Sequence, residues 1–152
     1  MRTRTTTDSR YVVDASVAAR FYLTDEEAAD KAAAFFDEVT AGRVTAFAPT
    51  LILYEVPRAL HRALRRGRFS IGAALDNSER FRQLGIRIVD EPTIPTAAIR
   101  LAETYGCNFY DACYLALAEL LGLPFLFADD KLERQLAGRL DYALPLARLE
   151  LA

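Results

Sequence analysis

The segment YVVDASVAARFY, residues 11–22, joins an apolar run to a stretch with helical spacing, with an aspartate between them. A short run rich in β-branched residues favours a buried strand, and apolar residues three and four positions apart favour a helix. We therefore expect a strand at 11–13 that ends at Asp14 and a helix at 15–22.

The same alternation of short apolar runs and helical segments continues along the chain. Further strands are expected at 45–48, 86–89, 124–127 and 146–149. Further helices are expected at 26–42, 51–67, 70–84, 95–106, 109–122 and 130–138. Strands separated by helices imply parallel pairing, with helices on both faces of the sheet. The sequence thus predicts an α/β fold whose first connections hold two helices each.

Residues that favour helix ends support these boundaries. Asp25 and Ser70 are expected to start helices, because both residue types cap helix N-termini well. Glycines stand where helices should stop: Gly42, Gly67, Gly85, Gly106 and Gly122. Pro57 is tolerated only in a first helical turn, so the helix around it is expected to begin later than residue 51 or to be kinked.

The composition indicates one globular domain. Of 152 residues, 52% are hydrophobic and 26% charged, and no apolar stretch reaches the length of a membrane span. We expect a loose, polar tail at 1–10 and a single domain at 11–152. Cys107 and Cys113 give no disulfide framework, and His61 is the one histidine, which argues against a zinc site. A reduced, cytoplasmic protein is the simplest interpretation.

Four acidic residues lie inside or at the end of apolar sequence: Asp14, Glu55, Asp111 and Asp129. Burying a carboxylate is costly unless its charge is compensated. In open α/β sheets, ligands bind outside the carboxyl ends of the strands, where both Asp14 and Asp129 should lie. We therefore expect one pocket that holds all four acids, whose oxygen atoms would suit a divalent cation.

Two of these acids have simpler explanations that stay open. Asp14 is as good an N-cap for the helix at 15–22 as it is a metal ligand, and Ser16 is either a hydrogen-bonding residue of the first turn or a support for Asp14. Glu55 stands among apolar neighbours, but an ion pair with Arg58 or Arg62 at helical spacing would also account for it.

The other two acids also start helices. Asp111 could be a favourable acid in the first turn of a helix capped by Asn108. Asp129 and Asp130 are adjacent, so one is expected to cap the helix that follows while the other reaches the metal. Glu119 is more simply a surface residue of its helix than a fifth ligand.

The basic residues are unevenly placed although the net charge is only −2. Five arginines fall within eleven residues: Arg58, Arg62, Arg65, Arg66 and Arg68. A solvated helix face is the simple explanation. Arginine also makes forked contacts with phosphates, and this cluster begins three residues after Glu55. The helix is therefore a candidate for contacts with phosphate groups.

No other catalytic arrangement is apparent. The chain has no Ser/His/Asp set, no Cys/His pair, no phosphate-binding glycine loop and no dinucleotide fingerprint. A pocket built only of acids leaves metal-ion catalysis as the chemistry that the sequence favours.

Four segments carry a family resemblance: VVDASV at 12–17, APTLILYEV at 48–56, YDACYLALAE at 110–119 and FADDKL at 127–132. In this order and with these spacings, the chain resembles the PIN-domain ribonucleases of the VapC toxin type. The resemblance implies a three-layer α/β/α sandwich with a mainly parallel sheet of four to five strands. It also implies a Mg²⁺- or Mn²⁺-dependent endoribonuclease, a homodimer, and a cognate antitoxin that inhibits it.

The resemblance assigns roles to particular residues. Its acidic positions fall on Asp14, Glu55, Asp111 and Asp129. Supporting roles are expected for Ser16, Asn108 and Asp130. RNA contacts are expected from Arg58, Arg62, Arg65 and Arg66.

Three positions depart from the family pattern. Phe127 stands where a Thr or Ser is usual two residues before the last acid, Pro57 and Arg58 replace a small residue and Asn, and Asn108 lies in a region where Ser is common. The loss of a hydroxyl at 127 supports a rival interpretation, a domain that binds protein or RNA without catalysis. A second rival, a phosphate-accepting domain, rests on Lys131 beside two acids and lacks the further residues it needs.

Overall fold

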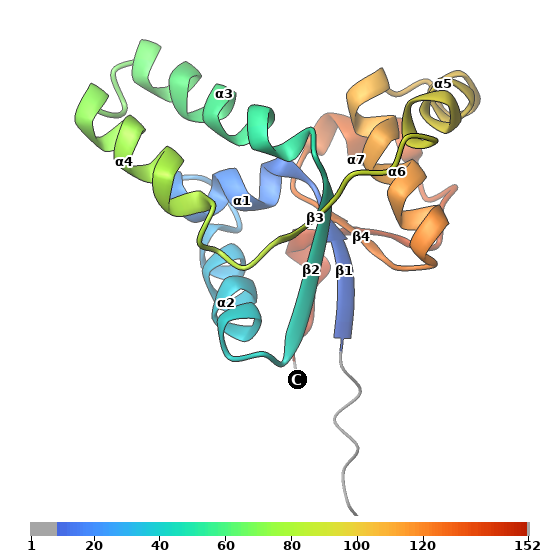
Figure 1. The fold of residues 1–152 in the computed structure, drawn as a ribbon, viewed down its shortest axis with the longest axis horizontal. Helices are drawn as coiled ribbons and strands as arrows, with labels where there is room; N and C mark the ends of the chain where they lie inside the picture. Colours follow the sequence, from blue (N-terminus) through green and yellow to red (C-terminus); the bar gives the residue numbers. More distant parts are fainter. Residues whose placement is uncertain (1–8, 152) are drawn as a thin grey trace, which may run out of the picture.

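The computed structural model describes residues 9–151 and contains a central sheet of five parallel strands (Figure 1). The strands are β1 (Ser9–Val13), β2 (Val44–Pro49), β3 (Arg87–Val89), β4 (Phe125–Phe127) and β5 (Ala143–Pro145). Their order across the sheet is β3-β2-β1-β4-β5. The parallel pairing follows from the helical crossovers, which return the chain to the same end of the sheet before each new strand.

Helices fill every crossover. They are α1 (Ala15–Tyr22), α2 (Ala29–Thr40), α3 (Ile52–Arg65), α4 (Ile71–Phe81), α5 (Ile94–Tyr105), α6 (Phe109–Leu121) and α7 (Asp130–Leu136), with a 3₁₀ turn η1 (Leu146–Arg148) near the end. On one face of the sheet α2 packs on β2 and α1 on β4, and on the other α6 packs on β1, β2 and β4 beneath α5. The predicted α/β/α sandwich is confirmed (Figure 1).

Helix α6 is the most deeply buried element. Every residue from Ala112 to Ala118 is buried, and the side chain of Tyr114 has no exposed surface. A helix that is apolar on all sides is stable only when other elements surround it, and here three strands and α5 do so. This rigid position fixes the start of α6, where Asp111 lies.

The strand order places a topological switch point between β1 and β4. From β1 the chain moves outward through β2 to β3, and it then crosses back to β4 and continues to β5. Ligands of open α/β sheets bind where the direction reverses, outside the carboxyl ends of the two strands. Asp14 directly follows β1, and Asp129 lies two residues after β4.

Most predicted helix ends are confirmed. Ser70 caps α4 by accepting a hydrogen bond from the Ala73 backbone amide, at 3.1 Å. All five glycines expected at helix ends have a left-handed backbone. Helix α3 begins at Ile52, one residue after the predicted start at 51, and continues through Pro57, its sixth residue.

The start predicted for the second helix is wrong. Helix α2 begins at Ala29, preceded by Ala28 with a φ of 63°, and residues 24–28 form turns instead. Asp25 does not cap this helix. The Asp25 carboxylate pairs with Arg68, and Glu26 pairs with both Arg20 and Arg68. These ion pairs replace the expected capping contact.

The last strand lies earlier than predicted. Strand β5 is Ala143–Pro145, paired with β4, and the segment expected as a strand at 146–149 begins with the η1 turn. Proline is rare within central strands but is tolerated at a sheet edge, where β5 lies. Leu146 and Leu149 are nevertheless buried. The apolar pattern at 146–149 therefore predicted their burial correctly but predicted the wrong backbone conformation.

Strand β1 begins at Ser9, two residues before the predicted start. The tail expected at 1–10 therefore falls mostly outside the described residues and stays a prediction. Cys107 and Cys113 are both free and buried. No helix within residues 9–151 combines the length and the apolar character needed to cross a bilayer.

Candidate functional site

Asp14 is held at the end of β1 as the N-cap of α1. Its Oδ2 accepts hydrogen bonds from the Ser16 backbone amide at 3.2 Å and from the Ser16 hydroxyl at 2.5 Å. The residue is 5% exposed and is the only buried charged residue in the described part of the chain. Burial raises its pKa to about 6 against the effect of the Ser16 hydrogen bonds, and the charges of Glu55 and Asp129 raise it further. The capping role is real, and it also places the carboxylate beside other acids.

Asp129 is the N-cap of α7, the last α-helix of the described chain, and it lies in the same cluster as Asp14. Its Oδ1 accepts hydrogen bonds from the backbone amides of Lys131 at 2.9 Å and Leu132 at 3.2 Å. The charge of Asp129 raises the pKa of both Asp14 and Asp111. Of the adjacent pair, Asp129 is therefore both the cap and the residue that faces the cluster, whereas Asp130 is the first residue of α7.

Asp111 lies in the first turn of α6, the buried helix. Asn108 caps this helix by accepting a hydrogen bond from the Asp111 backbone amide at 2.8 Å. Burial raises the pKa of the Asp111 carboxyl to about 7, with further contributions from Asp14, Asp129 and Glu55 that outweigh the opposite effect of Lys131. The charges of the other three acids thus all raise the pKa of Asp111.

Glu55 lies in the first turn of α3, and no ion pair joins it to Arg58 or Arg62. Burial raises its pKa, while the nearby Tyr114 hydroxyl and Arg58 lower it. Among the described residues, however, neither Glu55 Oε1 nor the Tyr114 hydroxyl makes a well-formed hydrogen bond, although both are buried. A buried carboxylate oxygen without a partner is costly and suits a position where a cation binds.

The structure therefore brings the four predicted acids together at the switch point between β1 and β4. In residues 9–151, no three acidic, His or Cys side chains are arranged to hold one metal ion as they stand. The available donors are carboxylate oxygens, which Mg²⁺ and Mn²⁺ prefer over nitrogen or sulfur. The chemistry of these donors fits such an ion.

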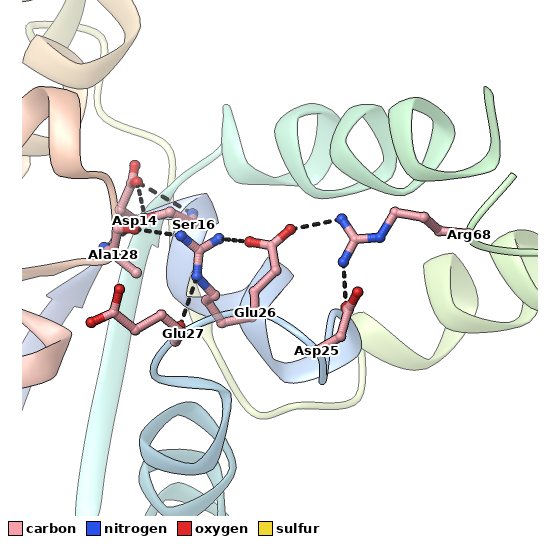
Figure 2. A network of polar contacts seen from close by, with 8 residues as sticks. Asp14, Ser16, Asp25, Glu26, Glu27, Arg68 and Ala128 are labelled. Atoms are coloured by element: carbon pink, nitrogen blue, oxygen red, sulfur yellow. Dashed lines mark hydrogen bonds and ion pairs between the residues drawn. The ribbon is translucent and has the colours of Figure 1, made fainter. Parts of the chain in front are cut away.

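Helix α1 also holds the peptide that precedes Asp129. The Ser16 hydroxyl accepts a hydrogen bond from the Ala128 backbone amide at 2.9 Å. Arg20 Nη2 donates to the Ala128 carbonyl at 2.9 Å, and its Nε donates to the Glu27 carbonyl at 3.1 Å. Both polar backbone groups of Ala128 are thus bound by side chains one helical turn apart (Figure 2).

This contact extends into an ion-pair network that sequence reasoning missed. Arg20 pairs with Glu26, whose other oxygen accepts from Arg68 Nη1 at 2.7 Å, and Arg68 also pairs with Asp25 (Figure 2). Arg68 therefore joins the loop after α1 and is not free to bind RNA. Ser16 and Arg20 are four residues apart and so lie on one face of α1, but this spacing alone does not identify the distant residue that they contact.

The other arginines of the cluster remain available. All four are exposed, and none makes a hydrogen bond or ion pair with another described residue: Arg58, Arg62, Arg65 and Arg66. Arg62 and Arg66 line a hollow of about 250 Å³ between α1 and α3 that Ser16 also lines. A positively charged surface therefore leads away from the acid cluster along α3.

Other candidate residues lie outside the cluster or in the core. Glu119, near the end of α6, accepts a hydrogen bond from the Tyr142 hydroxyl at 2.8 Å, in agreement with a surface role. Phe127 is buried and stacks on Phe125 with ring centroids 5.4 Å apart. The position where a hydroxyl was expected therefore belongs to the core, and Ser16 supplies a hydroxyl to the cluster from α1 instead.

Comparison with known proteins gives a consistent result. The family model described as "PIN domain" matches residues 11–135. A curated relative, exonuclease VapC9 of Pyrobaculum aerophilum, is 30% identical over 128 residues, which cover 84% of this chain and 95% of the relative.

Solved structures share the fold at lower identity. The crystal structure of PAE2754 from Pyrobaculum aerophilum has a TM-score of 0.68 and 22% identity, with 93% of each chain covered. VapC20 of Mycobacterium tuberculosis, titled a sarcin-ricin loop cleaving toxin, has a TM-score of 0.63 and 16% identity over 82% of this chain and 93% of that one. A toxin–antitoxin complex from Klebsiella pneumoniae has a TM-score of 0.60 and 15% identity over 93% and 99%.

Proposed function

The chain belongs to the PIN-domain family, and from that premise we propose that it is a metal-dependent endoribonuclease, the toxin of a toxin–antitoxin pair. One observation carries the proposal: four carboxylates, from the end of β1, from α3, from α6 and from the β4–α7 turn, lie near the switch point of the sheet, and the neighbouring acids help burial to raise the pKa of Asp14 and Asp111. Such a concentration of like charge destabilises a protein unless a cation offsets it.

Asp14, Asp111 and Asp129 would hold Mg²⁺ or Mn²⁺, with Glu55 binding directly or through a water molecule. When bound, such an ion lowers the pKa of a water molecule and neutralises charge on a phosphate. Ser16 keeps the Asp14 carboxylate oriented, because its amide and hydroxyl both donate to Oδ2. Burial and the neighbouring acids raise the pKa of Asp111 to about 7, so a cation held there would favour the deprotonated carboxylate.

The exposed arginines on α3 would bind the phosphates that flank the cleaved bond. Within residues 9–151 these arginines form no ion pair, so contact with RNA would displace none there. Asn108 and Asp130 support the site indirectly, the first by capping the helix that carries Asp111 and the second as a neighbour of Asp129.

The remaining parts of the proposal concern assembly and location. An inhibitory antitoxin is supported by the VapC relative and by the Klebsiella complex with the same fold. A homodimer is supported by the exposed Ile71 and Leu75 on α4. A cytoplasmic location is supported by Cys107 and Cys113, which are free thiols.

The experiment that tests the activity compares linear and circular forms of one unstructured RNA, incubated with purified protein and Mn²⁺ or with a chelator. We expect both forms to be cut in Mn²⁺ and neither in chelator. Cleavage of the linear form alone would assign an exonuclease, the activity that the name of the Pyrobaculum relative states. No cleavage and no Mn²⁺ uptake by calorimetry would instead identify a domain that binds without catalysis, which the core position of Phe127 would then explain.

A further inference from the structure

A second hollow lies beside the acid cluster, beyond the carboxyl ends of β2 and β3. Its volume is about 240 Å³. The turn between β2 and α3 forms one wall, the segment from β3 to α5 another, and the start of α6 the third. Pockets for drug-sized ligands measure about 300–1,000 Å³, so this hollow suits a single small heterocycle.

Two aromatic side chains line this hollow directly before an acid of the cluster. Phe109 and Tyr110 are the first two residues of α6, and Asp111 follows them. Phe109 is 40% exposed and Tyr110 is 55% exposed, although their rings meet edge to face at 5.7 Å. Partly exposed aromatic faces in a concave site are suited to stacking against a flat ring.

The charges around the acid cluster differ between its two sides. On the α1–α3 side, Arg62 and Arg66 line the neighbouring hollow and favour phosphate. On the aromatic side, the hollow is lined by Asp90 and Glu91, which repel phosphate. A carboxylate can, however, accept hydrogen bonds from the amino groups of a nucleobase. Glu91 is fixed in place because its Oε1 accepts from the Thr93 amide and hydroxyl at 3.1 and 3.0 Å, and Asp90 is exposed.

We propose that this hollow, the aromatic pocket, binds one unpaired nucleobase of the RNA next to the phosphate held at the acids. The inference rests on the proposed ribonuclease function and adds to it a base-binding subsite lined by Phe109 and Tyr110. In a duplex, each base is stacked and paired, so its faces and its hydrogen-bonding edge are occupied. An unpaired base can enter between Phe109 and Tyr110 on one side and the β3–α5 segment on the other.

The test measures binding without cleavage, in an Asp14→Asn background. A short labelled RNA is titrated as a single strand, as a duplex, and as a ribose-phosphate strand that lacks bases. Stacking contributes about 1–3 kcal/mol per base, so Phe109→Ala combined with Tyr110→Ala should weaken single-strand binding about 5- to 150-fold. Binding of the baseless strand should not change. A Tyr110→Phe protein retains the ring and should bind normally.

The matched control replaces two exposed apolar residues outside the pocket, Ile99→Ala and Leu120→Ala, and should leave binding unchanged. Oligomers of adenosine or cytidine should bind more tightly than oligouridine, which lacks an amino group for Asp90 to accept from. Equal loss with the baseless strand, or no loss in the double variant, overturns the proposal. The second result would fit a pocket that docks a protein segment.

Failure of this inference can be told apart from failure of the proposed function. If the unmodified protein cleaves RNA and the double variant binds single strands normally, only the aromatic pocket is wrong. If the unmodified protein cleaves no RNA in Mn²⁺, the ribonuclease function itself is wrong.

Discussion

The acid cluster has two halves that the fold holds in different ways. In the α1–β4 half, Asp14 is bound by Ser16, Asp129 is bound by the start of α7, and the peptide between β4 and Asp129 is fixed by Ser16 and Arg20. In the α3–α6 half, Glu55 Oε1 has no hydrogen-bond partner in the described structure and neither does the Tyr114 hydroxyl nearby.

The difference indicates how the site would respond to a cation. The α1–β4 half is already oriented, so it can serve as the fixed part of the site. The α3–α6 half carries the uncompensated charge, with the pKa of Asp111 raised to about 7, and has the most to gain when a cation arrives. We infer that closure around the ion involves mainly Glu55 and Asp111.

The largest expected effects come from removing one acid of each half. Asp14→Asn and Asp111→Asn should each reduce Mn²⁺-dependent RNA cleavage by about 100-fold or more, a loss typical of removing one electrostatic group that stabilises a transition state. The two variants should differ in stability without metal. Asp111→Asn relieves uncompensated repulsion and should raise the Tm, whereas Asp14→Asn disturbs the Ser16 contacts and should raise it less. Cleavage at full rate in either variant would contradict the metal role.

The four exposed arginines of the α3 region, which lie outside the acid cluster, give the next prediction. Replacing Arg58, Arg62, Arg65 and Arg66 together with Gln removes exposed charges that form no ion pair with other described residues, so the fold should be unaffected and RNA binding should weaken. For single strands each phosphate contact contributes about 0.7 to the slope of log affinity against log salt, so four contacts would reduce that slope by about 3. Binding isotherms at several salt concentrations measure it. An unchanged slope would mean that the α3 surface does not contact RNA.

A substitution at Arg20 tests whether its contacts with the Ala128 carbonyl and Glu26 position the α1–β4 half of the cluster. Arg20→Gln frees the Ala128 carbonyl and Glu26, so Mn²⁺ affinity should fall about 10-fold, in the range found when groups supporting metal ligands are removed. The expected loss of stability is about 1–3 kcal/mol. Arg43→Gln is the matched control, because Arg43 forms two hydrogen bonds with Glu38 on an exposed surface. If calorimetry gives the same Mn²⁺ affinity for both variants, the Arg20 contact does not position Asp129.

The smallest effect concerns pH and the metal-free protein. The pKa of Asp14 is about 6 and that of Asp111 about 7, both above the ordinary value of 3.8, so between these values the folded protein binds more protons than the unfolded chain. Their contribution to stability therefore falls as pH rises from about 4 through 7. We expect a Tm at least about 2–4 °C lower at pH 8 than at pH 5.5, equivalent to 1 kcal/mol for a chain of this size.

The double variant Asp14→Asn, Asp111→Asn should show a flatter dependence of Tm on pH, which separates these two groups from other carboxylates. Excess Mn²⁺ should oppose the decrease in the unmodified protein, since the ion binds the charged forms. A Tm that rises from pH 5.5 to pH 8 without metal would contradict the raised pKa values.

Much of the fold followed from the sequence because local patterns determine it. The βα order and most helix ends could be predicted, and a strand's carboxyl end fixes the position of Asp14, which directly follows β1; the shared role of the four acids stays a prediction. The last strand was predicted too late in the chain, at 146–149. Pro145 argued against a strand at 143–145, and the apolar Leu146 and Leu149 are buried without forming one.

The polar network could not be predicted in the same way. Arg20 and Ala128 are 108 residues apart, and Glu26 and Arg68 are 42 apart. Nothing in the local sequence distinguished Arg68, which forms ion pairs, from Arg66, which does not. Sequence reasoning assigned RNA contacts to Arg58, Arg62, Arg65 and Arg66 and treated Arg68 only as part of the same cluster; the ion pairs of Arg68 became apparent only in the three-dimensional packing.

The hydrogen bonds from α1 to the backbone of residue 128 have a consequence for evolution. Ser16 and Arg20 bind only the amide and carbonyl of that residue, and every amino acid except proline offers the same two groups. Substitutions at position 128 can therefore accumulate without a compensating change at positions 16 or 20. Covariation among relatives would fail to detect this contact, although it fixes the approach of the chain to Asp129.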